Sequence, residues 1–230
     1  NRWDIKDVNF PEYAMPEPNN KAKIYFVDVP GAKQSEIRIG YLSMQYTDPD
    51  YIPATVMNMK LGGNFSSDIN LTLREEKGFT YGARSRFTGS RFPGLFIASS
   101  AVRSNTTEES VQIFKDIMTR YREPISKEDL DFTKNMIIKS NSRRFETLGA
   151  LRGMIANIST YDLPFDYIKD RENMVRDFTV EEHNGLAKEY VRPSEMIYLI
   201  VGDAATQYEG LKSLGYGDPI MLNNNGNPVD

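Results

Sequence analysis

The stretch Leu61–Gly82 reads LGGNFSSDINLTLREEKGFTYG, and its changes of backbone pattern decide the fold. Gly62-Gly63 ends one predicted helix, and the residues Phe65–Glu76 predict a second. Gly78 is expected to end this second helix, because helices commonly end at a residue in the left-handed backbone conformation, which glycine adopts without steric strain. The run Phe79–Phe87 is rich in aromatic residues and is typical of a β-strand. The stretch therefore predicts two helices followed directly by a strand.

Outside this stretch, strands dominate the first half of the chain and helices the second. Further strands are expected at Lys23–Val29, Ser35–Met44, Leu95–Val102 and Glu195–Val201. A helix is expected from about Asp48 onward, and several more between about Thr106 and Tyr190. This segregation predicts an α+β fold, with a mainly antiparallel β-sheet and helices packed on one face.

The 230 residues suit one large domain or two small ones. Residues 1–20 carry Pro11, Pro16 and Pro18, and we expect a linker from a preceding domain there. The domain itself is expected over residues 21–222, followed by a flexible tail at 223–230 that is almost without apolar residues. Because the first residue is Asn and no signal peptide opens the chain, we expect a processed product or part of a longer protein.

Composition excludes several classes of function. The net charge of −4 attracts no phosphate backbone, so we expect no nucleic-acid partner. The chain has no Cys, which excludes disulfides, thiolate nucleophiles and zinc ribbons. No apolar run approaches the length of a membrane span.

The chain also lacks the residues of a zinc peptidase centre. Motifs of the H-x-x-E-H kind need two imidazoles one helical turn apart, and His183 is the only histidine. Because Glu181 and Glu182 precede it, His183 is expected at the surface of a charged helix. Gly62-Gly63 also invites a phosphate-loop interpretation, but it follows a helix and lacks the Gly-Lys-Ser/Thr ending. We therefore expect no metal or other cofactor in this chain.

Arg74 and Tyr81 are the remaining candidates for chemistry. A short reversal at Gly78 would bring the last turn of a helix close to the start of a strand, and with them these two side chains. A guanidinium offers several donors to peptide carbonyls, and a phenol offers one donor to a developing oxyanion. The alternative is structural: Arg74 pairs with Glu75 or Glu76, and Tyr81 is a surface aromatic of a strand.

A family resemblance bears on this choice. The stretch Leu61–Gly82 resembles the C-terminal-type domain of the pitrilysin, insulysin and mitochondrial processing peptidase family of zinc metallopeptidases. Val29–Gly40, Phe145-Glu146-Thr147 and Val201-Gly202-Asp203 are similar to the same domain, so the resemblance covers about residues 20–215. It implies a ferredoxin-like α/β roll that forms half of a metallopeptidase. This chain departs from the family at Asp68, where members carry Arg after the Ser-Ser pair.

The resemblance also implies roles and partners. Tyr81 would hydrogen-bond the tetrahedral oxyanion, and Arg74 would hold a substrate carbonyl. Zinc and the general base would come from an H-x-x-E-H domain or subunit, so this chain alone would be inactive. The substrate would be a peptide or unfolded polypeptide.

Two other functions stay open at this point. The same family fold serves as a non-catalytic structural subunit of the respiratory-complex core-protein type. An independent peptide-binding module would instead need peptide affinity of its own. The compartment is open too, with the periplasm as the hypothesis for a bacterial source.

Overall fold

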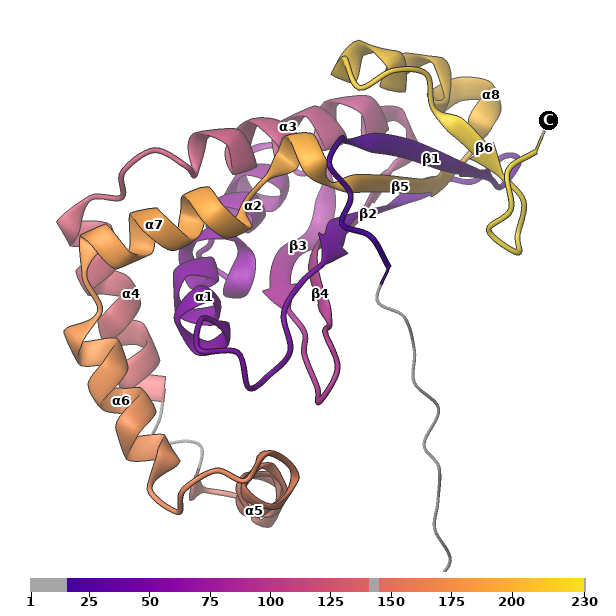
Figure 1. The fold of residues 1–230 in the computed structure, drawn as a ribbon. Helices are drawn as coiled ribbons and strands as arrows, with labels where there is room; N and C mark the ends of the chain where they lie inside the picture. The colour runs from indigo at the N-terminus through magenta and orange to yellow at the C-terminus, as the bar shows by residue number, and fades with distance from the viewer. Residues whose placement is uncertain (1–15, 141–144, 230) are drawn as a thin grey trace, which may run out of the picture.

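The computed structural model describes residues 16–140 and 145–229, and one mixed sheet organises them (Figure 1). The strands are β1 (Lys23–Asp28), β2 (Gln34–Leu42), β3 (Thr80–Phe87), β4 (Leu95–Arg103), β5 (Ile197–Gly202) and β6 (Ile220–Leu222). Their order across the sheet is β3-β4-β2-β5-β1-β6. The pairs β3–β4, β4–β2 and β2–β5 are antiparallel, whereas β1 runs parallel to both β5 and β6. The expected α+β class with a mainly antiparallel sheet is confirmed.

Alternation along the strands separates two faces of the sheet. Ile37 and Ile39 of β2 and Phe96 of β4 are fully buried on the helix-covered face. The intervening residues of β2, Glu36 and Arg38, are only half-buried and lie on the opposite face. Because successive side chains of a strand point to opposite faces, one face builds the core and the other stays open.

Some of the helices cover the core face, and others extend away from it. The helices are α1 (Tyr51–Asn58), α2 (Asp68–Asn70), α3 (Thr107–Arg120), α4 (Lys127–Ser140), α5 (Leu148–Tyr161), α6 (Tyr167–Asp177), α7 (Val180–Tyr190) and α8 (Ala204–Gln207). Two π-helical turns, η1 (Met59–Gly63) and η2 (Leu71–Glu76), follow α1 and α2, and short 3₁₀ turns are η3 (Ser104–Thr106), η5 (Pro193–Glu195) and η6 (Glu209–Leu214). Figure 1 shows α1, α2, α3 and α7 beside the sheet, with α4 and α6 extending away from it toward α5.

Local sequence signals explain several helix ends. The expected stop at Gly78 is confirmed: its φ is +63°, and the amides of Gly78 and Phe79 donate to the carbonyls of Arg74 at 3.1 Å and Leu73 at 2.9 Å, which closes the end of η2. At the start of α7, Thr179 and Glu182 form a capping box, for which the Thr-x-x-Glu spacing is the sequence signal. The helix over Phe65–Glu76 is shorter at its start than expected, because α2 begins only at Asp68.

The chain ends contain structure that the sequence pattern does not indicate. The short edge strand β6 pairs with β1 and has no counterpart among the expected elements. Residues 223–229, expected as a tail, form a turn in which the Val229 amide donates to the Met221 carbonyl at 2.9 Å. Most of the expected linker, residues 1–15, lies outside the described residues.

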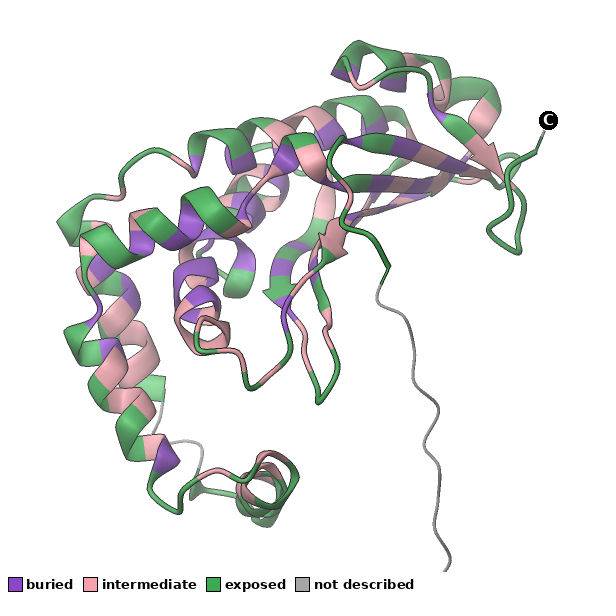
Figure 2. Ribbon diagram, in the orientation of Figure 1, coloured by how far each residue is buried: buried purple, intermediate pink, exposed green. Residues whose placement is uncertain are grey.

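Helix α5 stands apart from the core. None of its residues is buried, although it contains Leu148, Leu151 and Ile155, which are 87%, 38% and 67% exposed (Figure 2). Its C-terminal end is held by stacking of Tyr161 on Tyr46 at 3.9 Å between ring centroids. Within the described residues, no helix is both long and apolar enough to cross a bilayer.

Candidate functional site

A β-bulge at the start of β3 presents Tyr81. Thr80 pairs with Val102 and Ala83 with Ser100, so two residues, Tyr81 and Gly82, stand opposite one residue of β4. The side chains of Ala83, Ser85 and Phe87 are buried, and unbroken alternation would turn Tyr81 toward the same covered face. The extra residue reverses this direction, and Tyr81 is 91% exposed.

Polar side chains on both sides hold the bulge. The Thr80 hydroxyl accepts from the Gly82 amide at 3.1 Å and donates to the Ala101 carbonyl at 2.6 Å. The Ser100 hydroxyl donates to the Gly82 carbonyl at 3.1 Å. These bonds satisfy backbone groups that the interrupted ladder leaves without strand partners. The bulge is therefore a supported conformation of β3.

Asn70, at the end of α2, connects the bulge to the helices. Its side-chain oxygen accepts from the Ala83 amide at 3.0 Å, and its side-chain nitrogen donates to the Phe65 carbonyl at 2.7 Å. Asn70 is buried, so these two bonds replace contacts with water. Sequence reasoning missed Asn70, because nothing about a polar residue within a predicted helix indicates that its side chain will hydrogen-bond to a strand.

Arg74 lies in the π-helical turn η2, at about two-fifths exposure of its side chain. Its Nε is 3.2 Å from a carboxylate oxygen of Glu75, and its guanidinium lies 4.6 Å from the ring centroid of Phe65. Within the described residues, no hydrogen bond joins Arg74 to Tyr81. The structure thus contains the Glu75 pairing that the structural alternative expected, and the two candidate side chains are not in hydrogen-bonding contact.

Gly62 sets the distance between η1 and β3. A Cβ at this position would lie 2.4 Å from the backbone nitrogen of Ser85. The buried amide of Asn58 holds the same strand residue, donating to the Ser85 carbonyl at 2.9 Å and accepting from its hydroxyl at 2.6 Å. Gly62 thus serves close packing of η1 on β3, which explains this glycine without a phosphate.

The side chain of Tyr81 borders a hollow of about 400 Å³ on the open face of the sheet. Glu36 and Arg38 of β2 line this hollow together with Arg84 of β3, and Ser99 of β4 forms its floor. The candidate site therefore continues from the bulge across the neighbouring strands. Sequence reasoning missed these residues, because only the strand register places them side by side.

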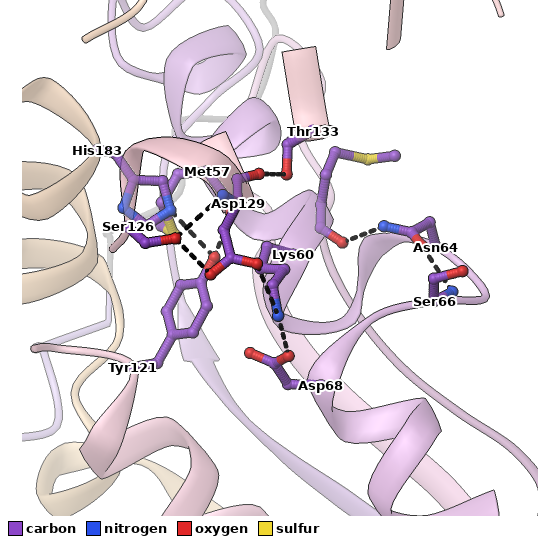
Figure 3. A network of polar contacts seen from close by, with 11 residues as sticks. Met57, Lys60, Asn64, Ser66, Asp68, Tyr121, Ser126, Asp129, Thr133 and His183 are labelled. Atoms are coloured by element: carbon purple, nitrogen blue, oxygen red, sulfur yellow. Dashed lines mark hydrogen bonds and ion pairs between the residues drawn. The ribbon is translucent and has the colours of Figure 1, made fainter. Parts of the chain in front are cut away.

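His183 is buried, and the expectation of a surface histidine is wrong. Only 2% of it is exposed. The hydroxyl of Tyr121 donates to the Met57 carbonyl at 2.7 Å, so it accepts from Nε2–H of His183 at 3.1 Å (Figure 3). Burial lowers the pKa of His183 to about 4, which keeps the imidazole neutral at physiological pH. The spacing of Val180, His183 and Leu186 along α7 was the available signal, because it places all three on one helix face.

Asp68 replaces the arginine that the family resemblance leads one to expect. Its carboxylate pairs with Lys60, whose Nζ also lies 3.8 Å from a carboxylate oxygen of Asp129 (Figure 3). Lys60 thus links α2 to the first turn of α4. The substitution supplies one anion of a structural ion-pair cluster.

The described residues contain no group of three or more His, Cys, Asp or Glu side chains that could hold a metal ion. The mixed sheet with its helical cover is the α+β architecture that the family resemblance implies for a metallopeptidase-type domain. A family model confirms this class. Residues 2–137 match the peptidase M16 inactive domain, and the chain belongs to that family.

Curated relatives agree with this assignment. The chain is 26% identical over 159 residues to a protein named "Probable inactive metalloprotease YmfF" of Bacillus subtilis, covering 66% of this chain and 36% of the relative. It is 23% identical over 155 residues to "Non-peptidase homolog YmxG" of Helicobacter pylori, covering 67% of this chain and 36% of the relative. The chain thus spans little more than a third of these relatives.

Solved structures share the fold. A peptidase M16 inactive domain from Pseudomonas fluorescens superposes with a TM-score of 0.74 at 24% identity, over 86% of this chain and 48% of that one. A chain of Complex III2 from Candida albicans superposes with a TM-score of 0.65 at 12% identity, over 81% of this chain and 46% of that one. The fold therefore occurs both in a peptidase M16 inactive domain and in a chain of Complex III2.

Proposed function

We propose that this chain is the substrate-binding, non-zinc domain of a zinc-dependent metalloendopeptidase. In this proposal Arg74 and Tyr81 both bind the peptide: Tyr81 hydrogen-bonds the oxyanion of the tetrahedral intermediate, and Arg74 holds a substrate carbonyl. The zinc and the general base come from an H-x-x-E-H domain or subunit. This chain spans only 36% of one curated relative and 48% of one solved chain, so those proteins are long enough for a second domain.

One observation carries the proposal. Tyr81 is 91% exposed because a bulge turns it outward, and several buried or half-buried polar side chains hold that bulge in place. A phenol needed only for packing would bury its ring, as Tyr198 does in the core. An exposed donor on a fixed backbone is suited to an oxyanion that another domain generates.

The test is to replace Tyr81 with Phe in the complete assembly with its zinc-bearing partner. Loss of a donor to the oxyanion lowers kcat by about 10²- to 10³-fold. Tyr25→Phe is the matched control, because Tyr25 is a half-buried strand residue on β1, away from the bulge. Unchanged turnover in Tyr81→Phe would refute the role of the phenol, and stoichiometric zinc in this purified chain would contradict the division of labour.

A structural role is the second candidate. It is supported by the similarity to a chain of a respiratory complex and by the names of the curated relatives, which call them inactive or non-peptidase. In that case the unaltered assembly has no peptidase activity, and Tyr81→Phe leaves the assembly intact. An H-x-x-E-H motif in the same or a neighbouring gene would decide in favour of the peptidase.

A further inference from the structure

Three arginines lie on the open face of the sheet next to Tyr81. Arg84 of β3 and Arg38 of β2 are both register partners of Ser99 on β4, so the two arginines flank Ser99 in one row across three strands. Arg86 lies two residues beyond Arg84 and therefore on the same face. Adjacent strands are about 4.8 Å apart, so the Cα atoms of Arg84 and Arg38 are separated by about 10 Å.

Most of this positive charge is not compensated within the described residues. Arg84 and Arg86 are exposed and have no carboxylate within ion-pair distance there. Arg38 has one: its Nη1 lies 2.7 Å from a carboxylate oxygen of Glu36, although the same nitrogen donates to the Ile37 carbonyl at 3.3 Å. Arg38, Arg84 and Arg86 thus supply three guanidiniums, and Glu36 is the carboxylate that pairs with one of them, in a chain whose net charge is −4.

The shape of the surface leaves room for a side chain between the two guanidiniums. Ser99 is small, lies at the floor of the hollow that Tyr81 also borders, and is only 8% exposed beneath its neighbours. A carboxylate placed above Ser99 could accept from Arg84 on one side and from Arg38 on the other. Guanidiniums suit this task because they offer several fixed donors to a planar carboxylate.

We infer that this arginine row selects peptides that carry an acidic side chain close to the segment held by Tyr81. The inference rests on the proposed function, since it names the class of peptide that the Arg74–Tyr81 site would take. Arg84 is the specificity-determining residue, because it borders the same hollow as Tyr81 and has no carboxylate partner among the described residues. Glu36 lies at the Arg38 side of the row and disfavours a second acidic group there.

The experiment is a chemical-shift titration of the full ¹⁵N-labelled chain with short Ala/Ser peptides that differ only in a central Glu, Gln or Lys. Titration to about 5 mM peptide detects millimolar affinity. We expect the Glu peptide to bind with a Kd about fivefold lower than the Gln peptide, a gain typical of a charge-assisted contact at a partly exposed site. The shifted amides should cluster at Ser99 and Arg84, and added salt should reduce the difference.

Two variants make the result specific. Arg84→Gln should bring the two Kd values together, whereas Arg152→Gln on the exposed surface of α5 should preserve the difference. Equal Kd values for the Glu and Gln peptides on the unaltered chain overturn the inference. Absence of shifts with every peptide at the highest concentration also overturns it.

Tyr81→Ala separates this inference from the proposed function. In one outcome the unaltered chain binds the Glu and Gln peptides equally well, and Tyr81→Ala weakens the binding of both. That result supports peptide binding by Tyr81 and refutes the selectivity for acidic peptides. In the other outcome the preference for the Glu peptide depends on Arg84, but Tyr81→Ala changes neither Kd. That result supports binding of acidic peptides by the arginine row and refutes the proposed role of Tyr81 in peptide binding.

Discussion

Acidification should destabilise this domain through the single side chain of His183. Its pKa in the folded chain is about 4 because the imidazole is buried, whereas an unfolded chain takes up the same proton near the ordinary value of 6.5. Stability is therefore fully present above about pH 6.5 and is lost as the pH falls toward 4. Below that value both states are protonated and this contribution stays constant.

The two pKa values set the size of the effect. A difference of about 2.5 units corresponds to about 3 kcal/mol in the free energy of unfolding, of which about 2 kcal/mol is lost between pH 7 and about pH 5. The hydroxyl of Tyr121 donates to the Met57 carbonyl, and Nδ1 of His183 is buried without a hydrogen-bond partner among the described residues, so a second proton on the imidazole would find no acceptor there. The carboxylates titrate mainly at lower pH, so the interval from 7 to 5 isolates the histidine.

Because the chain has one histidine, the assay is unambiguous. Urea unfolding would be measured across this interval for the unaltered chain and for His183→Gln, which cannot titrate. The imidazole ¹⁵N shifts of the folded chain would report the pKa directly. An imidazole pKa of 6 or above, or equal pH dependence of the two proteins, would refute the reasoning.

Two further predictions follow from packing. Gly62→Ala should lower the free energy of unfolding by about 1–3 kcal/mol, because the new Cβ would lie 2.4 Å from the Ser85 nitrogen and force η1 away from β3. Urea unfolding of the variant measures this loss, and an unchanged unfolding midpoint would contradict the prediction. Leu148→Gln on α5 should change stability by less than about 0.5 kcal/mol, because Leu148 is 87% exposed. A large loss in the isolated chain would show that Leu148 is buried in solution.

The sequence predicts most of the sheet, because local patterns determine its strands. β2 alternates between buried isoleucines and half-exposed polar residues, and the expected strand at Ser35–Met44 overlaps β2 almost completely. The stop at Gly78 and the capping box at Thr179 are also local signals, which depend on backbone geometry within a few residues. β6 escapes prediction because three residues carry too little pattern to separate a strand from a loop.

The candidate site is less predictable, since it depends on register. Arg74 and Tyr81 can be singled out from the sequence and its family resemblance, but their functional roles stay predictions. Nothing in Thr80-Tyr81-Gly82-Ala83 reveals that two residues oppose one, and the row of Arg84, Ser99 and Arg38 exists only once three strands are aligned. The prediction of an exposed His183 was wrong because it relied on the charged neighbours Glu181 and Glu182 and not on the position of His183 on the buried face of α7.

The bulge in β3 also makes the direction of Tyr81 depend on strand pairing and not on the tyrosine itself. If Tyr81 and Gly82 each paired with a residue of β4 without a bulge, alternation from Ala83 would place the tyrosine on the covered face with Ala83 and Ser85. The surface phenol would then vanish although the sequence of β3 was unchanged. Among relatives, the side chains that hold the bulge, those of Asn70, Thr80 and Ser100, are therefore as informative as the identity of the tyrosine: a domain that keeps the tyrosine without them has lost its presentation.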